Sequence, residues 1–185
     1  MSLTDLLSGS LTPDNIAAIA SRMGVDNAQA KKALGVALPA LINGLKKNSE
    51  TPEGAEALSN ALDAHGNDDE NIVDVVTNGR ANKGDKIAAH ILSSSTSDII
   101  SSIAEKAGLD SAKAGSLLEG LGPVVMGALG KTKKNQNLSA SDLSSLLSSE
   151  AGSFAKIAGK FFDQDGDGDF DLNDGLKLAM NFLKK

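Results

Sequence analysis

The sequence predicts an all-α protein, and three observations support this prediction. Apolar residues recur at helical spacing along most of the chain, and no segment shows the sustained alternation that is typical of strands. Capping residues and glycines mark helix ends at regular intervals. The chain also contains an internal repeat whose helix-end markers match between the two copies. Its 185 residues suffice for one domain with a small appendage.

The repeat is clearest between Thr12–Lys47 and Thr96–Lys131, where 13 of 36 positions are identical at a constant offset of 84. One inserted residue extends the match to residues 55–62 against residues 140–147. We therefore expect two copies, about residues 12–62 and 96–147, of about three helices each. Two repeats are too few for an open solenoid, so we expect the copies to pack about a pseudo-two-fold axis.

The first copy shows the ends of its first two helices most clearly. Thr12 should cap the first helix, with Pro13 at its first position, and Gly24 should end it. After a very short turn, Asp26 should cap a long second helix. Pro39 lies inside this second helix, where its ring and its missing N–H should produce a kink or a break.

The third helix of the first copy should begin at residues 51–53, a Thr-Pro-Glu sequence. Between the copies, residues 68–76 and 85–92 predict two shorter helices around a turn at residues 78–80. The corresponding markers of the second copy are Asp98, Gly108, Asp110, Pro123, and Ser139 with Asp142.

The first 153 residues contain no aromatic ring, so their core must close through small residues on the long helices. Seven such residues should permit close helix approach: Gly35, Ala37, Ala40, Gly120, Gly122, Gly127 and Ala128.

Composition excludes several classes of site. The chain has no cysteine, which excludes disulfides, thiolate metal sites and cysteine nucleophiles. It has no Tyr or Trp and only two histidines, so a histidine-rich metal site is excluded as well. We expect His65 to lie in a polar turn between helices and His90 to be half-buried beside Ile87 and Ile91.

The charge is concentrated at one place. The net charge is 18 − 24 = −6, and the segment 163–174 contributes six aspartates and no basic residue. The remaining chain is neutral and has two arginines, which argues against a dedicated nucleic-acid surface. All five phenylalanines fall in the last 32 residues. These changes in charge and in aromatic content along the chain predict a helical region over residues 1–150 and a distinct tail over residues 151–185.

The tail matches the calcium-binding loop of an EF-hand. Gly168 stands at position 6, where the loop turns sharply, and Phe170 stands at position 8. Ca²⁺ prefers six to eight oxygen ligands, and aspartates at alternating positions turn their carboxylates to a common centre. Asp169 should bind through its backbone carbonyl and Asp171 through a water molecule. The aspartates fall at loop positions 1, 3, 5, 7, 9 and 12: Asp163, Asp165, Asp167, Asp169, Asp171 and Asp174.

The flanks of this loop predict a helix–loop–helix unit, with an entering helix over residues 153–162 and an apolar stripe at Leu172, Leu176 and Leu183 after the loop. Two features depart from the usual pattern. Position 12 is Asp174 in place of glutamate, so we expect weaker selectivity for Ca²⁺ over Mg²⁺, or a loop like that of dockerins. The loop also has no second loop with which to pair.

Four segments together resemble the bacterial YidB-like family, a domain of unknown function. The resemblance covers about residues 10–135 and implies a compact helical domain in a bacterial protein, without an established reaction or cofactor. Members of that family also carry an Asp-rich tail, and often a histidine at the position of His90. The four segments are TPDNIAAIASRMGVD, KALGVALPALINGL, TPEGAEALSNALD and GDKIAAHIL.

From the sequence we expect a non-enzymatic calcium-binding protein that acts as a structural or protein-interaction module, with a protein partner or a second copy of itself. No secretory signal or membrane-spanning stretch is evident, which favours the cytoplasm. The alternative is a nucleic-acid-associated protein, because the first two helices of each copy fit a helix-turn-helix pattern. Its recognition faces would be Asp26, Asn27, Gln29, Lys31 and Lys32, and Asp110, Ser111, Lys113, Ser116 and Glu119.

Overall fold

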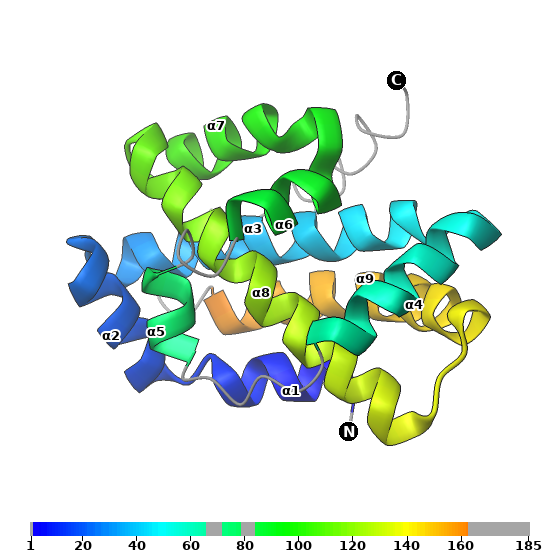
Figure 1. Ribbon diagram of the computed structural model, residues 1–185. Coiled ribbons are helices and arrows are strands. Elements are labelled where there is room, and N and C mark those ends of the chain that lie inside the picture. Colours follow the sequence, from blue (N-terminus) through cyan, green and yellow to red (C-terminus); the bar gives the residue numbers. More distant parts are fainter. Residues whose placement is uncertain (1, 66–71, 79–83, 163–185) are drawn as a thin grey trace.

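The computed structural model describes residues 2–65, 72–78 and 84–162, and these ranges are helical without any strand (Figure 1). The all-α prediction is therefore confirmed for the described part of the chain. The elements in order are α1 (Leu3–Ser10), α2 (Pro13–Met23), α3 (Asn27–Asn48), α4 (Pro52–His65), α5 (Ile72–Thr77), α6 (Gly84–Leu92), the 3₁₀ turn η1 (Ser93–Ser95), α7 (Thr96–Ala107), α8 (Ser111–Gln136) and α9 (Ala140–Phe162).

The helix ends predicted for the first copy are confirmed. The Thr12 hydroxyl accepts a hydrogen bond from the Asn15 N–H at 3.3 Å, which caps α2. Gly24 adopts the left-handed conformation, with φ +64°, and ends this helix. Two residues after Gly24, the Asp26 carboxylate accepts a hydrogen bond from the Gln29 N–H at 2.7 Å and caps α3.

The second copy uses the same chemistry at the corresponding positions. Gly108 ends α7 with φ +65°, and the Asp110 carboxylate accepts from the Lys113 N–H at 2.8 Å to cap α8. Ser139 and Asp142 cap the start of α9 through mutual hydrogen bonds. The start of α7 differs, because it follows η1 directly and has no side-chain cap.

The two internal prolines do not break their helices. Pro39 lies inside the unbroken α3 and Pro123 inside the unbroken α8, so the alternative of a break is wrong. An internal proline costs about 3 kcal/mol because it loses a hydrogen bond and crowds the preceding turn. Leu38 and Leu41, on either side of Pro39, are fully buried. Burying each leucine recovers about 1.5–3 kcal/mol, which is enough to hold the helix together.

The long helices α3 and α8 cross at the centre of the molecule, and the other helices surround them (Figure 1). Helix α3 packs mainly against α7 and α9, and α8 packs mainly against α4, α5, α6 and α7. Helix α9 therefore lies on α3, and α4 lies on α8.

Close approach depends on particular glycines in the long helices. A β-carbon at Gly120 would lie 2.1 Å from the carbonyl oxygen of Val76, so α5 can approach α8 only because residue 120 has no side chain. At Gly122, as predicted, helix α6 also approaches closely: a β-carbon would lie 3.1 Å from the Ile87 side chain and 3.3 Å from the Ala88 nitrogen. Gly44 provides a third close approach, which we did not predict. Gly127 has nothing within 4 Å of its β-carbon position, so its predicted role in packing is wrong.

One predicted helix in the middle of the chain is described in part, and the start of the chain contains a helix that was not predicted. The predicted helix over residues 68–76 is found as α5 from Ile72, and residues 66–71 lie outside the described ranges. Helix α1 was not predicted. Its signal was a capping box, in which the Ser2 hydroxyl accepts from the Asp5 N–H and the Asp5 carboxylate accepts from the Ser2 N–H, each at 3.0 Å.

Candidate functional site

The predicted calcium ligands all lie outside the described residues, as does the helix expected after them. These ligands are Asp163, Asp165, Asp167, Asp169, Asp171 and Asp174. Within residues 2–65, 72–78 and 84–162, no group of three or more His, Asp or Glu side chains is arranged to hold a metal ion. The structural evidence near the predicted loop is therefore the helix that leads into it.

That helix is α9, which runs from Ala140 to Phe162 without interruption. The predicted entering helix over residues 153–162 falls within α9. The helix passes through the predicted boundary at residues 150–153, and its last residue directly precedes Asp163. Leu143 and Leu147 are fully buried, so the N-terminal half of α9 belongs to the core.

Glu150 anchors the middle of α9 to the first helix of the chain. Its carboxylate accepts hydrogen bonds from the Thr4 N–H, at 3.2 Å, and from the Thr4 hydroxyl. Both residues are buried, with Glu150 8% and Thr4 6% exposed. The Thr4 N–H lies in the first turn of α1, where backbone donors have no partner within the helix. No local pattern could reveal this contact, because its partners are 146 positions apart.

The turns that end α2 and α7 each accept a hydrogen bond from a side chain of a long helix. The Gln29 side-chain amide donates to the carbonyl oxygen of Gly108 at 2.8 Å. The Lys113 ammonium donates to the carbonyl oxygen of Gly24, also at 2.8 Å. Positions 29 and 113 are 84 apart, as are positions 24 and 108. The same two donors belong to the proposed recognition faces, and Asp26 and Asp110 of those faces act as helix caps.

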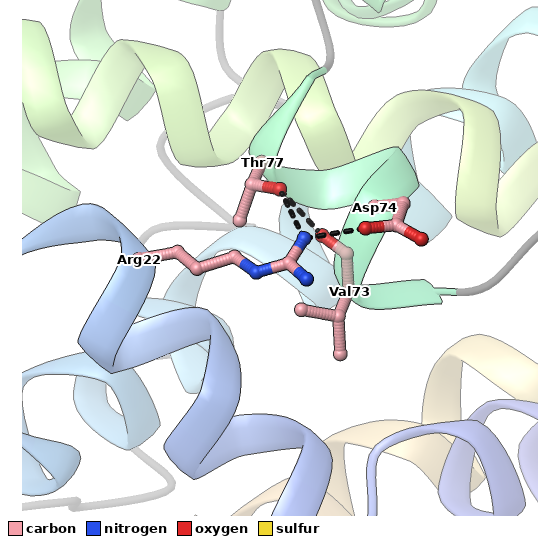
Figure 2. Close-up of polar contacts among 4 residues, drawn as sticks. All are labelled: Arg22, Val73, Asp74 and Thr77. Carbon is pink, nitrogen blue, oxygen red and sulfur yellow. Dashed lines mark hydrogen bonds and ion pairs between the residues drawn. The ribbon is translucent and has the colours of Figure 1, made fainter.

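Arg22 connects α2 to α5, as Figure 2 shows. Its guanidinium forms an ion pair with Asp74 and lies 3.5 Å from the Thr77 hydroxyl. The Thr77 hydroxyl in turn donates to the Val73 carbonyl at 2.7 Å. Both charged side chains are about half exposed, at 51% and 56%. One of the two arginines in the chain is therefore engaged in an internal contact.

Lys133 connects α8 to the C-terminal part of α4. Its ammonium donates to the Ser59 carbonyl at 2.9 Å and to the Asp63 carboxylate at 2.5 Å. The lysine side chain is only 12% exposed, whereas that of Asp63 is 68% exposed. Asp63 is thus neutralised by a lysine.

Of the two histidines, only His90 has a side chain within what the structure describes. His65 is the last residue of α4, and its side chain lies outside what the structure describes. His90 is exposed, and its carbonyl accepts from the Asn48 side chain at 3.3 Å. The expectation that it is half-buried is wrong. Ala88 and Ile91 point into the core, and His90 falls on the outer face of α6 between them.

Comparison with known proteins identifies the family but not the activity. No curated protein and no solved structure matches the chain significantly. The family model of a bacterial protein of unknown function, DUF937, matches residues 5–132. The chain belongs to this family.

The DUF937 match confirms the predicted resemblance to a bacterial family of unknown function. It extends from α1 into the last turns of α8 and includes the paired contacts of Gln29 and Lys113. Helix α9 and the Asp163–Asp174 segment follow the matched residues. None of the described helices combines the length and the hydrophobicity that crossing a membrane would require.

Proposed function

We propose that this DUF937 protein is a non-enzymatic calcium-binding protein that serves as a structural or protein-interaction module. The observation that carries the proposal is the spacing of the six aspartates between Asp163 and Asp174, with Gly168 at the turning position. These residue types at these positions supply the oxygen ligands that Ca²⁺ prefers. A cation would also offset the repulsion among six negative charges in twelve residues.

Helix α9 supports this proposal from the structural side. An EF-hand loop follows a helix directly, and the described part of α9 reaches Phe162, next to the first aspartate. The same helix is held in the core by Leu143 and Leu147, and by Glu150 bound to Thr4. An ion bound at the tail would therefore be attached to the body of the protein through a helix that already has a defined position.

We further propose that the helical body consists of two repeats related by a pseudo-two-fold axis. The paired contacts of Gln29 with Gly108 and of Lys113 with Gly24 support this relation, because the two donors are 84 positions apart and so are the two acceptors. The packing of α9 on α3 and of α4 on α8 supports it as well. No reaction follows from this arrangement, and an interaction module is the function class that suits it.

The nucleic-acid alternative requires the N-terminal turns of α3 and α8 to be free to enter a DNA groove. Gln29 and Lys113 would have to leave the carbonyls of the opposite copy to contact bases. Arg22 is likewise paired with Asp74. These contacts favour the packing role of the two turns over a role in nucleic-acid binding.

Calorimetric titration of the metal-stripped full chain with Ca²⁺, in Mg²⁺-free buffer, tests the calcium site. We expect one site per chain in the wild type and loss of that site in Asp163→Asn. The matched control is Asp98→Asn, which changes an exposed aspartate in the first turn of α7 and should bind Ca²⁺ as the wild type does. Absence of heat in the wild type, or equal heat in Asp163→Asn, would overturn the proposal.

A further inference from the structure

Helix α1 lies at the edge of the molecule and is attached to it at few points (Figure 1). It has eight residues and packs mainly on α8 and α9. The attachment consists of the buried side chains of Leu3, Leu7 and Leu11 and of the two hydrogen bonds from Thr4 to Glu150. Helix α3 packs mainly on α7 and α9, and α8 mainly on α4 to α7, so the centre of the core forms without α1.

A helix of this length is not stable by itself. Isolated helices shorter than about 12–15 residues are marginal in water, so α1 is helical because it is docked. Releasing residues 2–11 would return the conformational entropy of their backbone. This entropy is of the same order as the free energy that burying three leucine side chains provides. The docked and released forms of α1 therefore differ by a small free energy, and a single buried polar contact has a large effect on the balance.

Polar contacts hold the two ends of α1 in different ways. Near its N-terminal end, the Glu150 carboxylate of α9 accepts from the N–H and the hydroxyl of Thr4, and both residues are buried. At its C-terminal end, the Asn15 side chain of α2 donates to the carbonyl oxygen of Ser10 at 2.7 Å. Only residues 11–12 separate α1 from α2. The C-terminal end is therefore tethered to α2 like a hinge, and Glu150 holds the opposite end.

We propose that α1 is a hinged strap that opens from α8 and α9 as one unit while the rest of the protein stays folded. Glu150 is the latch that determines how often the strap opens, because its contact with Thr4 breaks whenever α1 leaves. Opening uncovers the apolar surface of α8 and α9 that α1 covers in the closed form. The strap is independent of the proposed calcium site and requires neither an ion nor a partner.

Hydrogen exchange of the native full chain, in EDTA and at increasing urea concentrations, tests the strap. The backbone N–H groups of Thr4, Leu6 and Leu11 all donate hydrogen bonds and are spread along α1. If α1 opens as one unit, these three amides exchange with the same opening free energy and with little dependence on urea. The amide of Leu41, in the middle of α3, should exchange at least about tenfold more slowly and with the urea dependence of global unfolding.

The Glu150→Ala variant tests the latch. It should speed exchange of the Leu11 amide by about tenfold, although Leu11 lies at the other end of α1, because opening the whole strap breaks the Glu150 contact. Glu150→Gln keeps an acceptor oxygen and should have a smaller effect. Ser148→Ala, at an exposed position of the same helix, is the matched control and should leave exchange unchanged.

Two results would overturn the proposal. If the amides of α1 exchange with the same free energy and urea dependence as that of Leu41, α1 opens only when the whole protein unfolds. If exchange at Leu11 is unchanged in Glu150→Ala, α1 frays without releasing Glu150 and does not open as a unit. The first result needs only the wild-type protein, so it stands even if a variant fails to fold. Because EDTA is present throughout, failure of the calcium site would not affect either measurement.

Discussion

The ammonium of Lys113 donates a hydrogen bond to the carbonyl oxygen of Gly24 at 2.8 Å, joining positions 89 residues apart. The reciprocal contact, from Gln29 to Gly108, has the same length. Together they bring the turn after α2 against α8 and the turn after α7 against α3. This relationship explains why the two turns contribute to tertiary structure in addition to ending their helices.

We expect Lys113→Glu to destabilise the protein by about 0.5–1.5 kcal/mol, because it removes the donor and places a carboxylate at a carbonyl oxygen. Lys113→Gln is the matched control, since it keeps a donor at the same position. Gln29→Glu should cause a similar loss of stability, because it removes the donor to Gly108, while the new carboxylate can still accept from the Asp26 N–H. Urea unfolding measures the differences. Equal stability of the glutamate and glutamine variants at position 113 would contradict this expectation.

Gly120→Ala should destabilise the protein by about 1–3 kcal/mol, because the added methyl group would lie 2.1 Å from the carbonyl oxygen of Val76 and force α5 away from α8. Gly127→Ala is the matched control in the same helix. It has nothing within 4 Å of the added carbon, and alanine is the better helix former by up to about 1 kcal/mol. The midpoint temperature of thermal unfolding should therefore fall in Gly120→Ala and rise in Gly127→Ala.

Glu150→Ala should cost about 1–3 kcal/mol, because it leaves the buried N–H and hydroxyl of Thr4 without their acceptor. Ser148→Ala, at an exposed position of the same helix, should change stability by less than about 0.5 kcal/mol. If the loss of stability in Glu150→Ala arises at Thr4, it should be smaller when Thr4 is replaced by valine, because one of the two donors is then already absent. Denaturant unfolding of the four variants measures this coupling, and strictly additive effects would exclude it.

Asp142 should lose its capping contribution at acidic pH. Hydrogen bonds from the Ser139 hydroxyl and the Ser139 N–H hold the pKa of its carboxyl below the ordinary value of 3.8. Because the pKa is lowered in the folded state, the stabilisation is present above that ordinary value and disappears as the pH falls through the folded pKa. An NMR titration of the Asp142 carboxyl measures this pKa, and Ser139→Ala should raise it. An unchanged pKa in that variant would contradict the assigned cause.

Local chemistry explains which features could be predicted. The ends of α2 and α3 follow from Thr12, Gly24 and Asp26, whose partners lie within a few residues. The capping box of Ser2 and Asp5 is the same kind of local signal, and it marks the start of α1, which was not predicted. The contact between Glu150 and Thr4 could not be predicted, because its partners are 146 positions apart in the chain.

By itself, the sequence determined the helical class, the capped ends, the repeated markers and the aspartate spacing of the proposed calcium loop. Each of these depends on interactions between residues close in the chain, or on residue types alone. Only the tertiary structure decided that α9 lies on α3, that Gly120 and not Gly127 admits a neighbouring helix, and that Lys113 meets Gly24. Such choices depend on how the shapes of distant surfaces fit together, and that fit exists only once the helices have packed.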